Sequence, residues 1–186
     1  MNPLVLNTFS RSFMKATFTL SNAVPQFETS NNGPWKIFEG RIRDYAENTC
    51  GPLGGTLYLL TGKSNYGVRI QAGRPVQDII TPLSYNRENF PGNAGNVKLV
   101  TPRAVWTAGC CVWAEPGKYF GKMWPAKKAE SFAVMSNNKD DGALLHQTEM
   151  SVSELERLLR PPLLEEVNLF PGDGNCRRPE NDKRLP

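Results

Sequence analysis

The chain has 186 residues, which is enough for one domain with a sizeable core and too few for two ordinary domains. Hydrophobic residues make up 39% and charged residues 22%, a composition typical of globular proteins and not of disordered ones. The 22 lysines and arginines exceed the 18 acidic residues by four, and this small excess favours contact with polyanions without identifying one. No apolar run is long enough to span a bilayer, and the first 20 residues lack the apolar centre of a signal peptide.

The first two predicted elements are a strand and a helix. Residues 16–24 are rich in Thr, Phe and Val and stop at Pro25, which predicts a strand that runs into a loop. Apolar residues then recur every three to four positions between Trp35 and Tyr45, the spacing of an amphipathic helix. Pro34 suits the first turn of this helix, and a nearby asparagine is expected to cap it.

The middle of the chain is predicted to be mainly sheet. Stretches rich in Gly, Pro and Asn separate four runs with the composition of strands. The runs are residues 56–61, 97–100, 104–112 and 131–135. Trp35, Trp106 and Trp113 fall on apolar periodicities, so we expect them to pack in the core rather than to stack on bases.

A second helix and a tail are predicted at the end of the chain. Ser151 and Glu154 have the spacing of a capping box, and the apolar positions after Ser151 predict a short helix that packs on the sheet and ends before Pro161. Residues 173–186 contain glycine, proline and charge with almost nothing to bury, which predicts a flexible tail. The basic pairs 127–128 and 177–178 are expected to lie on the solvated surface rather than on a nucleic acid.

The four cysteines allow disulfides without proving them. They lack CxxC spacing, and the sequence has one histidine, His146, so a cysteine and histidine zinc site is disfavoured. Cys110 and Cys111 are adjacent in a predicted strand and would point to opposite faces, so at most one of them can face a given partner. A bridge from Cys50 to one of them, or buried reduced thiols, are both compatible with these residues.

The segment 17–43 carries the chemistry. It resembles the ββα-metal family of DNA/RNA non-specific endonucleases, whose core reads T/S-N-x-x-P-Q, a short gap, N-x-x-x-W and a glutamate four residues after the tryptophan. Six positions match with every interval intact: Asn22, Pro25, Gln26, Asn31, Trp35 and Glu39. Without this pattern, Asn31 would be interpreted as a helix cap, and Glu39 with Arg43 as a solvated ion pair.

The resemblance extends over much of the chain and favours one group within the family. The segments 58–62, 98–113, 129–137 and 167–172 are similar to the animal endonuclease domain-containing 1 proteins. This implies a nuclease domain over residues 1–172, followed by the tail. Because members of that group are typically secreted or membrane-associated, it also implies an extracellular or secretory location and a disulfide from Cys50 to Cys110 or Cys111.

The resemblance implies a role for each matching polar residue. The amide oxygen of Asn31 would be the single direct protein ligand of Mg²⁺, or of Mn²⁺ in its place, with water in most other positions. Glu39 would hold one of those waters, and Arg43 would interact with the phosphate or its pentacovalent transition state. Asn22 would form a hydrogen bond near the attacked phosphate.

The general base of the family is a histidine in a D-R-G-H motif, which is followed closely by Asn-Pro. Met1-Asn2-Pro3 matches the residues after that motif, so the chain is expected to begin just downstream of the histidine. His146 lies in no matching motif. We therefore expect an incomplete α+β domain of the ββα-metal class, with a twisted, mostly antiparallel sheet flanked by helices.

The function implied by the resemblance is Mg²⁺-dependent hydrolysis of DNA and RNA without sequence specificity. The missing histidine leaves an alternative, a non-catalytic pseudo-nuclease that binds nucleic acid or protein. Genomic sequence upstream of Met1 distinguishes the two, because an exon that ends in D-R-G-H favours the enzyme. A third possibility is a chain too incomplete to fold, which thermal unfolding would test. The oligomeric state is left open.

Overall fold

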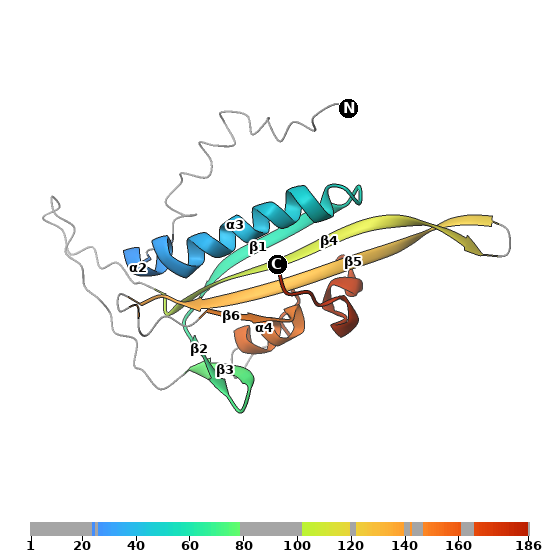
Figure 1. The fold of residues 1–186 in the computed structure, drawn as a ribbon. Coiled ribbons are helices and arrows are strands. Elements are labelled where there is room, and N and C mark those ends of the chain that lie inside the picture. Colours follow the sequence, from blue (N-terminus) through green and yellow to red (C-terminus); the bar gives the residue numbers. More distant parts are fainter. Residues whose placement is uncertain are drawn as a thin grey trace, which may run out of the picture.

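The computed structural model describes residues 24, 26–78, 102–119, 122–139, 142, 147–160 and 166–185. The predicted strand at 97–100 and nearly all of the one at 16–24 lie outside these residues. So do Asn22 and His146. The described part is an α+β structure with two antiparallel sheets, as expected (Figure 1).

The main sheet has four antiparallel strands in the order β1-β4-β5-β6. They are β1 Thr56–Ser64, β4 Ala104–Tyr119, β5 Lys122–Asn137 and β6 Gln147–Met150. The predicted strands at 56–61, 104–112 and 131–135 are therefore confirmed, and β4 and β5 are each longer than predicted. A separate hairpin, β2 Gly67–Gln71 and β3 Arg74–Asp78, was not predicted; its turn places Ala72 and Gly73 at positive φ, 50° and 74°.

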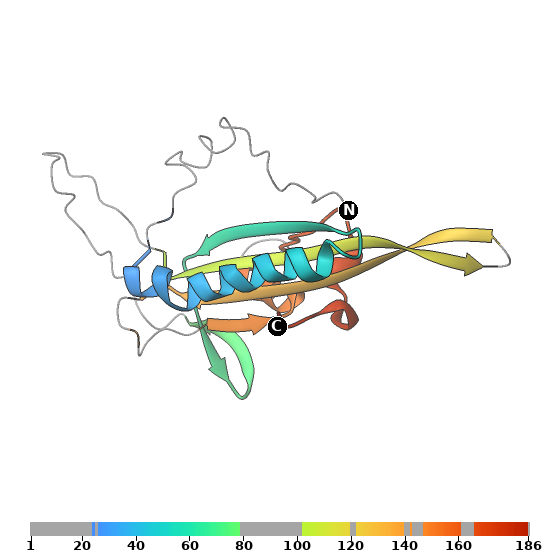
Figure 2. The same ribbon diagram turned by 45° about the horizontal axis from the view of Figure 1, so that its top comes forward.

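A helical run crosses one face of the main sheet (Figures 1 and 2). It consists of α2 Glu28–Ser30, a π-type turn Asn31–Trp35, α3 Lys36–Tyr45 and a second π-type turn Ala46–Cys50. Its backbone is broken at Gly33 (φ −94°, ψ −124°), so Pro34 lies just before α3, where its missing N–H costs no hydrogen bond. The predicted helix is confirmed, but the run begins earlier, at Glu28. The predicted asparagine cap is wrong, because Trp35 precedes α3 and makes no side-chain cap.

The core has two layers, one on each face of the sheet, because successive residues of β4 point to opposite faces. The layer under α3 contains Trp35, Phe38, Tyr45, Cys50, Val105, Cys111, Phe132, Val134 and Leu185. The other layer is covered by α4 Val152–Leu159 and by the C-terminal residues. It includes Val68, Ala108, Cys110, Met135, Leu155, Leu158, Phe170 and Cys176. Trp35 is buried, and Trp106 and Trp113 pack against these layers, as predicted.

The helix α4 begins with the predicted capping box. The N–H of Glu154 donates to Ser151 Oγ at 3.1 Å, and the N–H of Ser151 donates to Glu154 Oε2 at 3.0 Å. These two bonds satisfy donors that the first helical turn leaves free. Val152, Leu155 and Leu158 are buried against the sheet, as their spacing predicts.

The C-terminal residues are ordered in two 3-10 turns, Gly174–Arg177 and Pro179–Asn181, which corrects the prediction of a flexible tail at 173–186. Cys176 and Leu185 are buried, and the N–H of Lys183 donates to the carbonyl of Ser131 on β5 at 2.7 Å. The segment holds little apolar surface, and it is fixed by a disulfide, by backbone hydrogen bonds, and by ion pairs of Asp173, Arg177 and Lys183 with the rest of the protein. Composition does not reveal these interactions.

Two disulfides clamp the two layers onto the same point of β4. Cys111 bonds Cys50 at the end of the helical run, and Cys110 bonds Cys176 in the C-terminal segment. The prediction that the adjacent cysteines point to opposite faces is confirmed, and so is the bridge from Cys50 to one of them. The second bridge was not predicted, because Cys176 falls in the expected tail.

Candidate functional site

The segment that carries Asn31 is held by hydrogen bonds to the end of β5. The N–H of Phe27 donates to Asn138 Oδ1 at 3.0 Å, and the hydroxyl of Thr29 donates to the carbonyl of Lys139 at 3.0 Å. The buried hydroxyl of Ser30 donates to the carbonyl of Asn137 at 3.4 Å. These contacts fix the start of the helical run against the sheet.

Asn137 and Asn138 act as buried clamps at this point. Asn137 accepts from the N–H of Val68 at 2.8 Å and donates to its carbonyl at 3.0 Å, which ties β2 to the end of β5. Asn138 donates to the carbonyl of Pro102 at 3.0 Å while it accepts from Phe27. Sequence reasoning missed this role, although two amide side chains directly after an apolar strand were a usable signal.

Asn31 lies on the solvent side of the run and is not a helix cap. Its backbone is helical (φ −70°, ψ −47°), and its N–H donates to the carbonyl of Phe27 at 2.9 Å. The side chain is exposed, and its amide makes no hydrogen bond to another described residue. The amide oxygen is therefore not used in helix capping, the alternative interpretation of this residue.

Aromatic packing sets the orientation of the residues that follow. Trp35 and Phe38 are buried under the run with ring centroids 6.0 Å apart, and Phe38 meets the ring of Phe132 on β5 edge-on at 6.4 Å. With this side buried, Glu39 and Arg43 are exposed. They form no ion pair with each other in the described structure, so the interpretation as a simple ion pair is not supported.

The ion pair between Arg41 and Glu149 shows which side of α3 faces β6, and Glu39 and Arg43 lie on the other side. The Arg41 guanidinium binds the carboxylate of Glu149 on β6 and the carbonyl of Leu185. Residues of an α-helix are about 100° apart, so Glu39 and Arg43 lie on the flank away from Arg41. Figure 2 shows β1 along that side of α3 and β6 along the other. Glu39 and Arg43 thus lie on the exposed, β1-side flank of α3, and the candidate site consists of this flank and the exposed Asn31 at the start of the helical run.

The oxygen donors of the candidate site are of the kind that suits a hydrated divalent metal ion. An amide oxygen and a carboxylate are hard oxygen donors, and Mg²⁺ keeps several waters when few protein ligands are present. The described residues contain no group of three or more His, Cys, Asp or Glu that could enclose a metal. The candidate site needs no such group, because one amide oxygen would bind the metal directly and a carboxylate would bind it through a water molecule.

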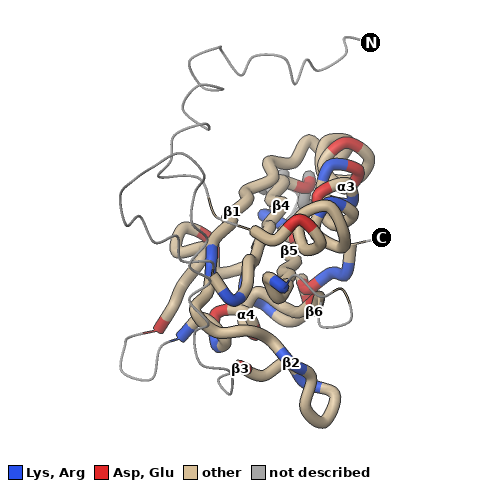
Figure 3. The backbone as a smooth tube through the Cα atoms, turned by 90° about the vertical axis from the view of Figure 1, so that its left-hand side faces the viewer, with Lys and Arg blue, Asp and Glu red and all other residues tan. Residues whose placement is uncertain are grey.

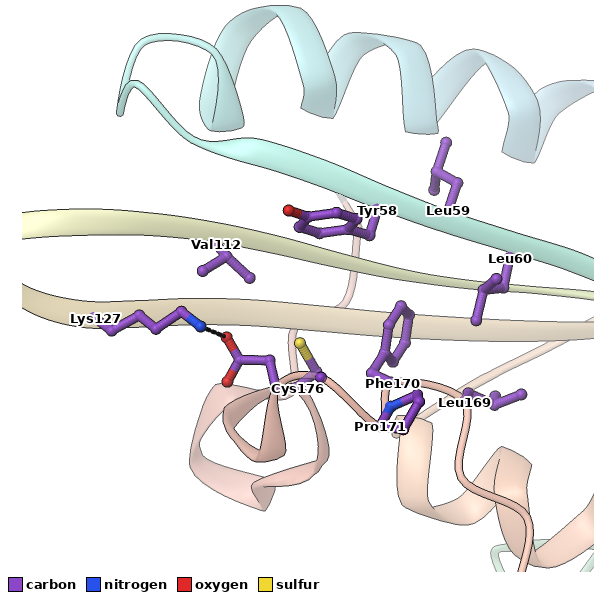
Figure 4. Close-up of a pocket in the computed structure, with 11 residues that line it drawn as sticks. Tyr58, Leu59, Leu60, Val112, Lys127, Leu169, Phe170, Pro171 and Cys176 are labelled. Carbon is purple, nitrogen blue, oxygen red and sulfur yellow. Dashed lines mark ion pairs between the residues drawn. The ribbon is translucent and has the colours of Figure 1, made fainter.

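A cavity of about 410 Å³ lies on the opposite face of the sheet from α3 (Figure 4). Tyr58, Leu60 and Phe170 are among the residues that line it, and the charged residues of its lining are Lys127 and Asp173. These two form an ion pair of 2.8 Å, and Lys127 lowers the pKa of the Asp173 carboxyl. Their charges compensate each other, and the cavity lies across the sheet from Asn31.

Comparison with known families identifies the class to which this α+β fold and its polar helix flank belong. The family model for DNA/RNA non-specific endonucleases matches residues 1–161. The chain therefore belongs to the DNA/RNA non-specific endonuclease family.

Two further comparisons gave no significant match, one with curated proteins and one with solved structures. The sequence-based recognition of the family is confirmed, and the similarity to the animal endonuclease domain-containing 1 group stays a prediction. Among the described residues, no helix has the length and apolar character needed to cross a membrane.

Proposed function

We propose that this chain is built for Mg²⁺-dependent hydrolysis of phosphodiester bonds in DNA and RNA without sequence specificity. The observation that carries the proposal is the intact family spacing from Asn31 to Glu39 on a helical run that buries Trp35 between them. Family membership supports the reaction class. The exposed Asn31 amide and Glu39 carboxylate supply the oxygen donors.

Four residues, Asn22, Asn31, Glu39 and Arg43, have separate tasks in this proposal. The Asn31 amide oxygen binds the ion directly, and the Glu39 carboxylate accepts a hydrogen bond from a water on the ion. Arg43 pairs with a phosphate oxygen and stabilises the added negative charge of the transition state. Asn22 donates a hydrogen bond near the same phosphate. When bound, Mg²⁺ would stabilise the leaving oxygen.

A non-catalytic binding module is the alternative, and the identity of the general base decides between the two. The sequence has one histidine, His146, and it lies outside the family motif and outside the described residues. General-base catalysis contributes on the order of a hundred- to ten-thousandfold in rate. Without that base, the flank would still bind the ion and the phosphate but would turn over slowly.

The two disulfides support a location in an oxidising compartment. All four cysteines are paired, and such bonds persist in secreted proteins but are rare in the cytosol. We propose that the protein acts in the secretory pathway or outside the cell.

Titration of Mn²⁺ into the full chain, followed by electron paramagnetic resonance in the presence of a short DNA duplex, tests the metal site. Asn31→Ala should abolish or strongly weaken Mn²⁺ binding. Asn32→Ala, a neighbouring exposed amide, is the matched control and should bind as the natural chain does. Equal Mn²⁺ affinity of Asn31→Ala and the control would contradict the proposed ligand.

Cleavage of supercoiled plasmid and of a structured RNA in Mg²⁺ separates the enzyme from the binding module. The enzyme should nick both substrates, and EDTA should abolish the nicking. Mn²⁺ and nucleic-acid binding without cleavage would support the alternative.

A further inference from the structure

The edge strand β1 lies beside the candidate site. β1 is the first strand in the sheet order β1-β4-β5-β6, and among the described residues it pairs with β4 alone. β1 runs along the side of α3 that Glu39 and Arg43 occupy (Figure 2). The face of β1 that points toward α3 is therefore next to the residues proposed to act on a phosphate.

The register of the sheet shows which side chains of β1 lie on this face. Lys63 is opposite Val105, which belongs to the core layer under α3, and residues directly opposite each other share a face of the sheet. Side chains alternate along a strand, so Leu59 and Thr61 lie on the same face. All three are exposed, which means that α3 does not cover them. We call residues 59, 61 and 63 the β1 strip.

Lys63 lies at the end of the β1 strip that is level with the start of the helical run. Its neighbour Ser64 is opposite Ala104, and Asn137 of β5 is opposite the same Ala104. Asn137 in turn accepts the hydrogen bond of the Ser30 hydroxyl, and Ser30 directly precedes the proposed metal ligand. Two strand spacings, about 10 Å, separate β1 from β5. Lys63 is therefore near the proposed ion but displaced sideways from it.

The Lys63 side chain is available to bind an anion. Among the described residues it forms no ion pair, whereas the cations at positions 41, 127, 128, 177, 178 and 183 do. Lys36 and Arg43 of α3 are exposed and likewise form no ion pair within the described structure. These two lie about 20° apart around the helix, so they share one side of it. Two neighbouring elements thus present unpaired cations beside Glu39, an arrangement that suits a row of phosphates.

We propose that Lys63 binds the phosphate next to the one that is cleaved, so that a nucleic-acid strand lies along the β1 strip beside α3. This inference rests on the proposed function and adds to it a contact from a second element. Leu59 and Thr61 carry no charge and would lie under the sugars. Contacts to phosphate and sugar carry no sequence information, which agrees with cleavage without sequence specificity.

Protection of the sheet edge is the competing role for Lys63, because lysines on edge strands hinder pairing with another chain. Such a lysine acts best in the middle of an exposed apolar run. The exposed apolar residues of β1 are Tyr58, Leu59 and Leu60, and Lys63 lies three residues beyond them. Its position next to the start of the helical run favours the contact with a phosphate.

Binding of a fluorescent 12-nucleotide DNA strand, and of an RNA strand of the same sequence, tests the contact. Anisotropy is measured in EDTA between 50 and 200 mM salt. The test variant is Lys63→Gln. The matched control is Arg69→Gln, which removes the same charge from an exposed strand position on the β2–β3 hairpin, away from α3 (Figure 3).

Lys63→Gln should bind DNA roughly three- to tenfold more weakly than the natural chain at 100 mM salt, and the salt slope should fall by about one contact. The RNA strand should be affected equally, because the contact is to a phosphate. Arg69→Gln should bind within about twofold of the natural chain. In the natural chain, the DNA strand should also slow hydrogen exchange in residues 56–64.

Equal affinity and salt slope of Lys63→Gln and the control would overturn the inference and leave the proposed function intact, since that function depends on the metal site of Asn31. A natural chain that binds no nucleic acid at 50 mM salt would overturn both. If Lys63→Gln associates in light scattering while its DNA affinity equals that of the control, Lys63 protects the edge and the inference is wrong.

Discussion

The ring of Phe132 lies directly over Gly109, its cross-strand partner in the β4–β5 ladder. A Cβ atom on Gly109 would approach Phe132 Cζ to 2.1 Å. The space that glycine leaves lets Phe132 meet Tyr45 edge-on at 5.5 Å and Phe38 at 6.4 Å. This pair therefore sets the surface on which α3 packs.

Gly109→Ala should destabilise the fold by about 2–3 kcal/mol, because the added methyl group displaces a buried ring. Urea unfolding measures the change. Gly40→Ala on α3 is the control: outside its chain neighbours and the nearby backbone of the helix, no atom lies within 4 Å of the added Cβ, so higher helix propensity should stabilise the chain by roughly 0.5–1 kcal/mol. Equal stability of Gly109→Ala and the natural chain would contradict this packing.

Asn138→Ala should cost about 2–4 kcal/mol, because it leaves the Phe27 N–H and the Pro102 carbonyl without their partner. It should also weaken Mn²⁺ binding, since Phe27 lies four residues before Asn31. The exposed Asn32→Ala should change stability by less than about 0.5 kcal/mol. A stable Asn138→Ala variant with normal Mn²⁺ affinity would show that the clamp does not position the site.

The natural chain should lose stability at alkaline pH because of Tyr45, and Tyr45→Phe should remove that part of the loss. Burial, and secondly the hydrogen bond of 2.9 Å to Glu130, raise the pKa of Tyr45. Above pH about 10 the unfolded chain releases this proton and the folded chain keeps it, so stability falls by about 1.4 kcal/mol per pH unit. Below that pH the contribution is fully present.

Urea unfolding between pH 9 and 11 measures the slope. Tyr45→Phe should have a shallower slope than the natural chain, by one proton. Tyr58→Phe, at an exposed position on β1, is the matched control and should keep the natural slope. If the unfolding free energy of Tyr45→Phe changes with pH as steeply as that of the natural chain, Tyr45 is not the source of the slope.

Removing either disulfide should cost about 2–5 kcal/mol, because the bonds close loops of similar length, with sequence separations of 61 and 66 residues. Hydrogen exchange should distinguish the two double alanine variants. Loss of the Cys50–Cys111 bond should increase exchange at the C-terminal end of the helical run. Loss of the Cys110–Cys176 bond should increase exchange in residues 174–185. The same pattern in both variants would argue against independent clamps.

The elements with a local signal were predicted and those held by distant contacts were not. The capping box of Ser151 and the apolar spacing from Trp35 to Tyr45 act within a few residues, so the sequence reveals them. The ordered segment after Gly172 depends on Cys176 and on a backbone bond to Ser131, a residue about 50 positions away. The clamp of Asn138 likewise joins residues 27 and 102, which only the fold brings together.

For the site, the intervals from Asn31 to Glu39 followed from a family pattern. Physical reasoning on the same residues alone favoured a helix cap and an ion pair. The structure supports neither of these, because Asn31 has a helical backbone and Glu39 does not pair with Arg43. The continuation of β4 and β5 beyond the end of β1 was also hidden in the sequence, where Gly, Pro and charge between two strands are typical of a loop.

The overlapping spans of the two disulfides affect how the protein responds to proteases. One bond joins residues 50 and 111 and the other joins 110 and 176, so every peptide bond between Cys50 and Cys176 lies inside at least one covalent ring. A single cut anywhere in that interval opens a ring without releasing a fragment. The nicked chain should migrate as one band on a gel until a reductant separates the pieces.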